Sequence, residues 1–261
     1  MKDAHYLIEY RFQGSSKDEI RGMINHLKKK FHLPTFGKTV PHITLAGGLT
    51  TENEDRLIKD FVSICSKTLL CKYTVDGFGH FENETGVIFI NIKPNENLKT
   101  FRWMLAQKIT GYCKLKEFDY KQDFNFHATL AMNLNDHDFS RLKKYIDTQP
   151  EPKYKQVLIR ATILKNSRIL CEYDFLQRRL LNRGEALSTR ELTKTFHLLD
   201  DYFKGKYDPN KGIYNPNKER IDPDKGKYNI NSVQPQKTHL KKKSWIGKIP
   251  FIGKILEGRE S

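Results

Sequence analysis

Apolar positions recur along roughly the first 180 residues with the two periods that distinguish strands from helices. Tyr6, Ile8 and Tyr10 occupy alternate positions, which predicts a strand, and Ser15 or Ser16 is expected to cap the helix that follows. The predicted strands cover residues 5–12, 41–49, 71–81, 86–92 and 125–134, and residues 154–181 are β-rich with a hairpin turn near 165–167. The predicted helices cover residues 16–31, 51–68, 97–113 and 138–147. Because many strand links are short, we expect an α+β fold with antiparallel sheets.

The chain changes character after residue 181. Ser188 and Glu191 have the spacing of a capping box and open a predicted helix that ends near Phe203. Three seven-residue units follow, at 207–213, 214–220 and 221–227, and each contains Asp/Asn-Pro-Asn/Asp-Lys turn chemistry. These units either stack as turns against the body or form a linker. We therefore predict a folded domain (1–181), a helical connector (182–204), heptad repeats (205–232) and a basic, apolar tail (233–261).

The formal net charge of +15 points to polyanionic partners such as RNA or a nucleotide. Residues 204–261 contain 14 Lys and Arg against six Asp and Glu, so they hold +8 of this excess. Within them, the lysines at 241–243 precede an apolar segment at 245–256 that includes Trp245. This combination is typical of contact with an anionic membrane surface, and docking on a protein partner or on the chain's own body is the alternative.

The N-terminus lacks a secretory signal pattern, and no stretch approaches the roughly 20 apolar residues that cross a bilayer. We therefore expect a cytoplasmic location, with the tail allowing a peripheral position at the inner membrane face. The four cysteines, Cys65, Cys71, Cys113 and Cys171, form no C-x-x-C pair. Reduced, mostly buried thiols are expected, with no metal site and no cofactor.

One short pattern occurs twice, 85 residues apart, as Pro-His-Ile-Thr-Leu around His42 and Phe-His-Ala-Thr-Leu around His127. In a strand, residues at i and i+2 share a face, so each copy presents an imidazole together with a hydroxyl, from Thr44 or Thr129. The intervening residues, such as Ile43, are expected to face the core. No other histidine in the chain is followed two places later by threonine.

A pair of imidazoles is suited to breaking a phosphodiester bond. One can take a proton from water and the other can give a proton to the leaving oxygen, because both titrate near neutral pH. The two threonine hydroxyls can donate to the phosphate oxygens without a metal ion. We therefore predict His42 and His127 as the catalytic pair and Thr44 and Thr129 as substrate-binding residues, with the acid and base roles left open.

With these two motifs the chain resembles the two-histidine (2H) phosphoesterase superfamily, within it the 2′–5′ RNA ligase and cyclic phosphodiesterase branch, over roughly residues 4–181. The resemblance implies a bilobal fold in which two antiparallel sheets with outer helices face a central cleft, each contributing one motif. It implies hydrolysis of 2′,3′-cyclic phosphates or 2′–5′ linkages of RNA or nucleotides. Many relatives carry an arginine three residues after the second threonine, where this chain has Met132. Compensating contacts could come from Tyr10, Arg11, Lys38 or Lys165.

Two other classes of function remain open. The domain could bind nucleotides or RNA without cutting them, or the chain could be a membrane-tethered scaffold that acts through its basic tail. Other conspicuous residues have simpler interpretations: His80 is expected to be a partly exposed structural histidine, and His137 belongs to a helix start. Gly77 and Gly79 do not form a dinucleotide-binding fingerprint.

Overall fold

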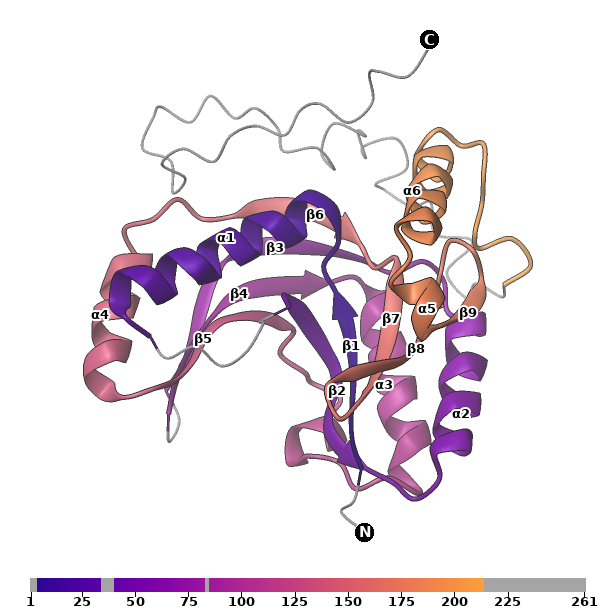
Figure 1. Ribbon diagram of the computed structural model, residues 1–261, viewed down its shortest axis with the longest axis horizontal. Coiled ribbons are helices and arrows are strands. Elements are labelled where there is room, and N and C mark those ends of the chain that lie inside the picture. The colour runs from indigo at the N-terminus through magenta and orange to yellow at the C-terminus, as the bar shows by residue number, and fades with distance from the viewer. Residues whose placement is uncertain (1–3, 34–39, 83–84, 214–261) are drawn as a thin grey trace.

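The computed structural model describes residues 4–33, 40–82 and 85–213, which form two antiparallel sheets flanked by helices (Figure 1). The five-stranded sheet has the order β2-β1-β7-β8-β9 and the four-stranded sheet the order β5-β4-β3-β6. The first sheet consists of β1 (His5–Arg11), β2 (His42–Thr50), β7 (Arg160–Lys165), β8 (Arg168–Asp174) and β9 (Arg179–Asn182). The second consists of β3 (Lys72–Glu82), β4 (Gly86–Pro94), β5 (His127–Leu134) and β6 (Lys153–Val157). The predicted α+β class with two antiparallel sheets is confirmed.

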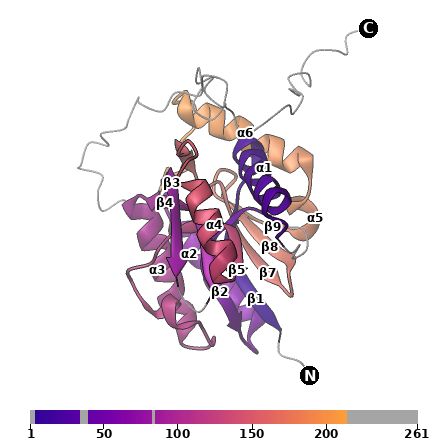
Figure 2. The same cartoon turned by 90° about the vertical axis from the view of Figure 1, so that its left-hand side faces the viewer.

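Two pairs of helices flank the two sheets (Figures 1 and 2). Helices α1 (Gly14–Phe31) and α4 (Asp136–Ile146) pack on the four-stranded sheet. Helices α2 (Glu54–Lys67) and α3 (Glu96–Thr110) pack on each other and contact β8 and β2 of the five-stranded sheet, and α3 also contacts β3 and β4 of the other sheet. Among the described residues, no helix is both long enough and apolar enough to cross a bilayer.

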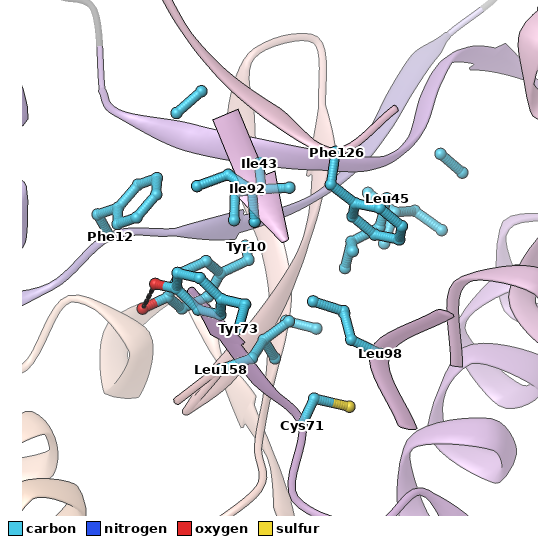
Figure 3. Packing of buried hydrophobic residues seen from close by; sticks show 14 of the residues in the cluster. Tyr10, Phe12, Ile43, Leu45, Cys71, Tyr73, Ile92, Leu98, Phe126 and Leu158 are labelled. Atoms are coloured by element: carbon cyan, nitrogen blue, oxygen red, sulfur yellow. Dashed lines mark hydrogen bonds between the residues drawn. The ribbon is translucent and has the colours of Figure 1, made fainter. Parts of the chain in front are cut away.

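One hydrophobic core joins the two sheets. Tyr10 and Ile43 come from the five-stranded sheet, while Tyr73 and Ile92 come from the four-stranded sheet, and Figure 3 shows them packed together. The Tyr73 hydroxyl donates to the Tyr10 hydroxyl at 3.2 Å, with the two rings 5.7 Å apart. Both tyrosines are almost fully buried, so each hydroxyl needs a partner inside the protein. The sheets therefore share one folded unit. All four cysteines are free and buried, as predicted.

The predicted hairpin between β7 and β8 is confirmed. Asn166 and Ser167 form its two-residue turn with φ of 47° and 65°. Positive φ at both central positions is the geometry whose twist matches a β-hairpin, and asparagine tolerates it better than most residues.

The predicted caps and helix starts are partly wrong. Helix α1 begins at Gly14, its N-cap is Gln13 without a side-chain hydrogen bond, and Ser16 is buried where its hydroxyl accepts from Gln156 at 2.8 Å. The serine pair therefore does not cap the helix. Two four-residue elements, the 3-10 helix η1 (Glu117–Tyr120) and helix α5 (Arg183–Ala186), were not predicted, because four residues are too few to display a period.

Helix α6 (Thr189–Phe203) begins as predicted, with the Ser188 side chain accepting from the Glu191 backbone N–H at 3.4 Å. The Glu191 carboxylate bonds to Arg179 and Lys194, so the reciprocal half of the capping box does not form there. A complete capping box stands instead at the start of α5.

The first heptad unit packs on the body of the domain. The Tyr207 hydroxyl donates to the Leu176 carbonyl oxygen, and the Asn210 side chain accepts from the Leu70 backbone N–H at 2.7 Å. For this unit, docking as a turn against the body is the observed arrangement. The other two units and the tail lie outside the described residues.

Candidate active site

The two predicted motifs lie on strands that meet. His42 is the first residue of β2, at the edge of the five-stranded sheet, and His127 is the first residue of β5, at the edge of the four-stranded sheet. These two edge strands contact each other, as both ribbon views show (Figures 1 and 2). Two segments 85 residues apart in the sequence are thus brought side by side.

The alternation of side chains within each motif follows the prediction. Ile43 and Leu45 on β2 are 1% and 0% exposed, and Ala128 and Leu130 on β5 are 0% and 3% exposed. By contrast, the histidine and threonine of each motif are only half-buried. Each strand therefore anchors its motif through the core face and leaves the imidazole and the hydroxyl on the other face.

Both imidazole rings are held in the same way. The Nδ1 atom of His42 lies 2.9 Å from the Val40 carbonyl oxygen, and that of His127 lies 2.8 Å from the Asn125 carbonyl oxygen. A carbonyl oxygen can only accept, so Nδ1 must carry the proton in each ring. In the neutral form, this leaves Nε2 with a free lone pair. Both rings are therefore oriented to exchange a proton through Nε2.

His127 lies in an aromatic environment. Its ring centroid is 5.2 Å from that of Phe81 and 4.9 Å from that of Phe89. Burial lowers the pKa of His127 below its ordinary 6.5, and repulsion from a charged His42 lowers it further, while the hydrogen bond to Asn125 opposes the shift. The neutral ring is thus favoured at neutral pH, and the two imidazoles are close enough to interact electrostatically.

His42 has charged neighbours instead. The Oε2 atom of Glu9 lies 3.7 Å from His42 Nδ1, and Glu9 Oε1 accepts from Arg11 Nε at 2.5 Å. Glu9 is only 2% exposed although it is a carboxylate. Glu9 lies in the first predicted strand, but its role could not be predicted from the sequence, because its proximity to His42 depends on which strand pairs with β1.

Cross-strand register explains the difference between the two rings. On β1, Arg11 is opposite His42 and Glu9 is opposite Thr44. On β4, Asn91 is opposite His127 and Phe89 is opposite Thr129. Two nearly identical motifs therefore have unlike partners, an ion pair on one side and an amide with an aromatic ring on the other.

Gly79 makes room for that aromatic ring. A Cβ at Gly79 would lie 2.5 Å from Phe89 Cε2 and 2.7 Å from Asn91 Oδ1, closer than real atoms approach. Gly79 lies within strand β3. Its structural role is to let Phe89 lie across β3 beside His127.

The residues suggested as replacements for the arginine missing at Met132 have different positions. Arg11 is next to His42, as its register shows, and is 17% exposed. Tyr10 is wrong as a candidate, because it is 2% exposed and burial raises its pKa to about 12. Lys165 pairs with Glu54 at 2.6 Å and lies opposite Tyr6, at the far end of β1 from His42. Lys38 lies outside the described residues.

Two other histidines singled out from the sequence, His80 and His137, lie at the surface. The His80 side chain is 40% exposed beside Glu82, and His137 lies in the first turn of α4, 77% exposed. Within the described ranges, no three or more His, Cys, Asp or Glu side chains are grouped as metal ligands. A hollow of about 720 Å³ under α4 includes Phe139 and Lys143 in its lining, but neither motif contributes to it.

One family model matches this chain, and several solved structures resemble it. Among curated proteins none matches this chain. Solved structures that resemble it include E. coli LigT, with 16% identity over 70% of this chain and 95% of LigT at a TM-score of 0.42. They also include Kluyveromyces marxianus Usb1 with uridine monophosphate, with 12% identity over 69% of this chain and 98% of Usb1 at a TM-score of 0.38. The sequence model of the 2′-5′ RNA ligase superfamily matches residues 16–164, a range that includes both motifs and more than half of the chain. The chain therefore belongs to the 2′-5′ RNA ligase superfamily of two-histidine phosphoesterases.

Proposed function

We propose that this protein is a metal-independent phosphodiesterase that hydrolyses 2′,3′-cyclic phosphates or 2′–5′ linkages of RNA or nucleotides, with His42 and His127 as its acid–base pair. Members of the superfamily are phosphodiesterases. The observation that carries the proposal is the arrangement of the two rings. Each is fixed by an Nδ1–H bond to a main-chain carbonyl, each has Nε2 free, and the two interact electrostatically from adjoining strands.

The unlike surroundings of the rings support a division of roles. His127 favours its neutral form, so its Nε2 is suited to accept a proton from the attacking water. His42 has the Glu9 carboxylate 3.7 Å from its Nδ1, and we assign to His42 the donation of a proton to the leaving oxygen. The water oxygen then forms the new bond to phosphorus, the bond from phosphorus to the leaving ribose oxygen breaks, and each proton is accounted for.

The threonines are proposed to bind the phosphate. Thr44 and Thr129 each follow their histidine by two residues on the same strand face and are half-buried. A hydroxyl in such a position can donate to a non-bridging phosphate oxygen whose charge grows during the reaction. A 2′,3′-cyclic phosphate is a favourable substrate because its ring already holds the leaving oxygen.

The experiment is a turnover assay on 2′,3′-cyclic nucleotides and on 2′–5′ oligoadenylate in the presence of EDTA. We expect turnover by the full chain and a loss of about 100- to 10,000-fold in kcat in His42→Ala or His127→Ala, the usual contribution of one acid or base. His137→Ala is the matched control, because His137 is an exposed histidine in the first turn of α4. Equal turnover in all four proteins would exclude the proposed pair.

The alternative of a nucleotide-binding module has a different signature. It predicts measurable binding of the same nucleotides by the full chain without turnover of any of them. Turnover that requires both histidines and persists in EDTA excludes that alternative.

A further inference from the structure

Glu9 is a buried carboxylate in the middle of a strand. It is 2% exposed and lies between Ile8 and Tyr10, which are equally buried. Burying an ionised carboxylate is unfavourable unless charges or hydrogen bonds compensate. Arg11 supplies one such partner, at 2.5 Å from its Nε to Glu9 Oε1. Glu9 is therefore held in place on one oxygen.

The other carboxylate oxygen points to the predicted catalytic residues. Glu9 Oε2 lies 3.7 Å from His42 Nδ1. Glu9 is also directly opposite Thr44 in the pairing of β1 with β2, so it lies beside both members of the first motif. The Val40 carbonyl already accepts from His42 Nδ1, which sets which nitrogen carries the proton. What Glu9 adds is negative charge beside that nitrogen.

The second motif provides an internal comparison. His127 has the same Nδ1–carbonyl bond, but the residue opposite Thr129 is Phe89, which carries no charge. A carboxylate is therefore not needed to orient the ring of such a motif. A carboxylate beside only one of the two imidazoles is what an enzyme needs if that imidazole must hold a proton that the other lacks.

We propose that Glu9, fixed by Arg11, is a positioning residue that places negative charge beside His42 Nδ1 and so stabilises the His42 ring in its proton-donating form; this rests on the proposed phosphodiesterase function. Glu9 touches no substrate in this scheme. It acts only through His42, as carboxylates that hydrogen-bond to metal-bound histidines act through those histidines.

The sheet also contains a matched control. Glu172 on β8 is 2% exposed like Glu9, and it pairs with Arg160 at 3.1 Å and with Thr162 at 2.6 Å. It lies two strands further from His42 along the same cross-strand row, because Glu9 is opposite Thr162 and Thr162 is opposite Glu172. Glu172→Gln therefore removes a buried, paired carboxylate of the same sheet without touching the predicted acid.

The test compares Glu9→Gln, Glu9→Asp and Glu172→Gln in the full chain. In Glu9→Gln we expect kcat on a 2′,3′-cyclic nucleotide to fall about 10- to 100-fold, the range for loss of a supporting partner, with KM nearly unchanged. Glu9→Asp returns the charge but withdraws it by one methylene, so its kcat should lie between those of Glu9→Gln and wild type. The kcat of Glu172→Gln, calculated per folded protein molecule, should equal that of wild type.

A second measurement does not depend on turnover. In protein with 15N-labelled histidine, the Nδ1–H resonance of His42, identified by its absence in His42→Ala, should move upfield in Glu9→Gln and exchange faster with water. In Glu172→Gln it should stay in place. If the wild-type chain turned over no phosphodiester, the proposed function would fail, and this resonance would still decide whether Glu9 acts on His42. If Glu9→Gln does not fold, Glu9→Asp is used for both measurements. An unmoved resonance together with an unchanged kcat would overturn the inference.

Discussion

A substitution at Thr195 tests whether helix α6 is an integral part of the domain. The residue is 0% exposed, and its hydroxyl joins α6 to the five-stranded sheet by accepting from Arg160 Nη2 at 2.6 Å and donating to Asp174 Oδ2 at 2.5 Å. Arg160 and Asp174 are themselves 1% and 0% exposed. The family match ends at residue 164, so this helix lies beyond the part of the chain that the family defines.

The change Thr195→Val keeps the shape of the side chain and removes both bonds, together with the hydroxyl's contacts to Gln177 Nε2 at 3.2 Å and to the Glu191 carbonyl oxygen at 3.0 Å. A hydrogen bond to a charged group contributes about 1.5–3 kcal/mol, and a buried partner left unpaired loses its solvation as well. Arg160 keeps its bonds to Asp174 and Glu172, and Asp174 keeps those from Arg160 and the backbone, so the loss is partial. We expect the free energy of unfolding to fall by about 3 kcal/mol, which for a domain of this size lowers Tm by roughly 6–12 °C.

Chemical and thermal unfolding of the full chain measure this loss. Thr193→Val is the matched control, because Thr193 is exposed on the same helix and the substitution is the same. It should change the free energy of unfolding by no more than about 0.5 kcal/mol. If Thr195→Val cost no more than Thr193→Val, the inference that a buried polar cluster attaches α6 to the sheet would be refuted.

Two further predictions concern the surroundings of His127. Gly79→Ala should cost about 1–3 kcal/mol in unfolding free energy and lower kcat/KM, because the new Cβ displaces Phe89 from its place beside His127. Gly22→Ala is the control, because Gly22 lies in α1 where a Cβ meets nothing within 4 Å, and it should stabilise the protein by about 0.5–1 kcal/mol. If Gly22→Ala lowered the free energy of unfolding as much as Gly79→Ala, the steric explanation would be contradicted. Burial and His42 lower the pKa of His127 in the folded protein. Just below pH 6.5, the unfolded chain therefore binds more protons than the folded protein does. The contribution of His127 to stability is complete above pH 6.5 and is lost as the pH falls through its folded pKa. Denaturant unfolding on both sides of pH 6.5 should show that the free energy of unfolding falls more on acidification in wild type than in His127→Gln. Parallel plots of this free energy against pH for the two proteins would refute the prediction.

Most elements of the fold were predictable because a strand or helix covered on one side displays a period. The faces of β2 and β5 followed from alternation alone, and the buried Ile43 and Leu45 confirm them. Strand order was not predictable, since alternation fixes which face a residue occupies and not which strand lies beside it. The pairing of β1 with both β2 and β7 belongs to this second kind of information.

The residues missed at the candidate site were missed for that reason. The sequence places Glu9 in a strand, but only the register shows it opposite Thr44. Gly79 and Phe89 lie on neighbouring strands, and their mutual fit is visible only when β3 and β4 are paired. The first heptad unit shows another limit of prediction from sequence. Its turn residues could be recognised in the sequence, whereas its contact with Leu70 depends on the tertiary fold.

The repetition of one motif raises a chemical problem that the cross-strand neighbours resolve. Two identical imidazoles in identical surroundings would have no preference for which ring carries the proton, whereas hydrolysis requires one particular ring to accept a proton while the other donates one. The strand pairing breaks this symmetry, because β1 places a carboxylate and a guanidinium beside the first motif and β4 places an aromatic ring beside the second. If the two motifs exchanged strands, the motif on each strand would have nearly the same sequence as before. Each histidine would nevertheless take over the role of the other. On this reasoning, the acid and base of the proposed reaction are determined by residues 9, 11 and 89 and not by the histidine motifs themselves.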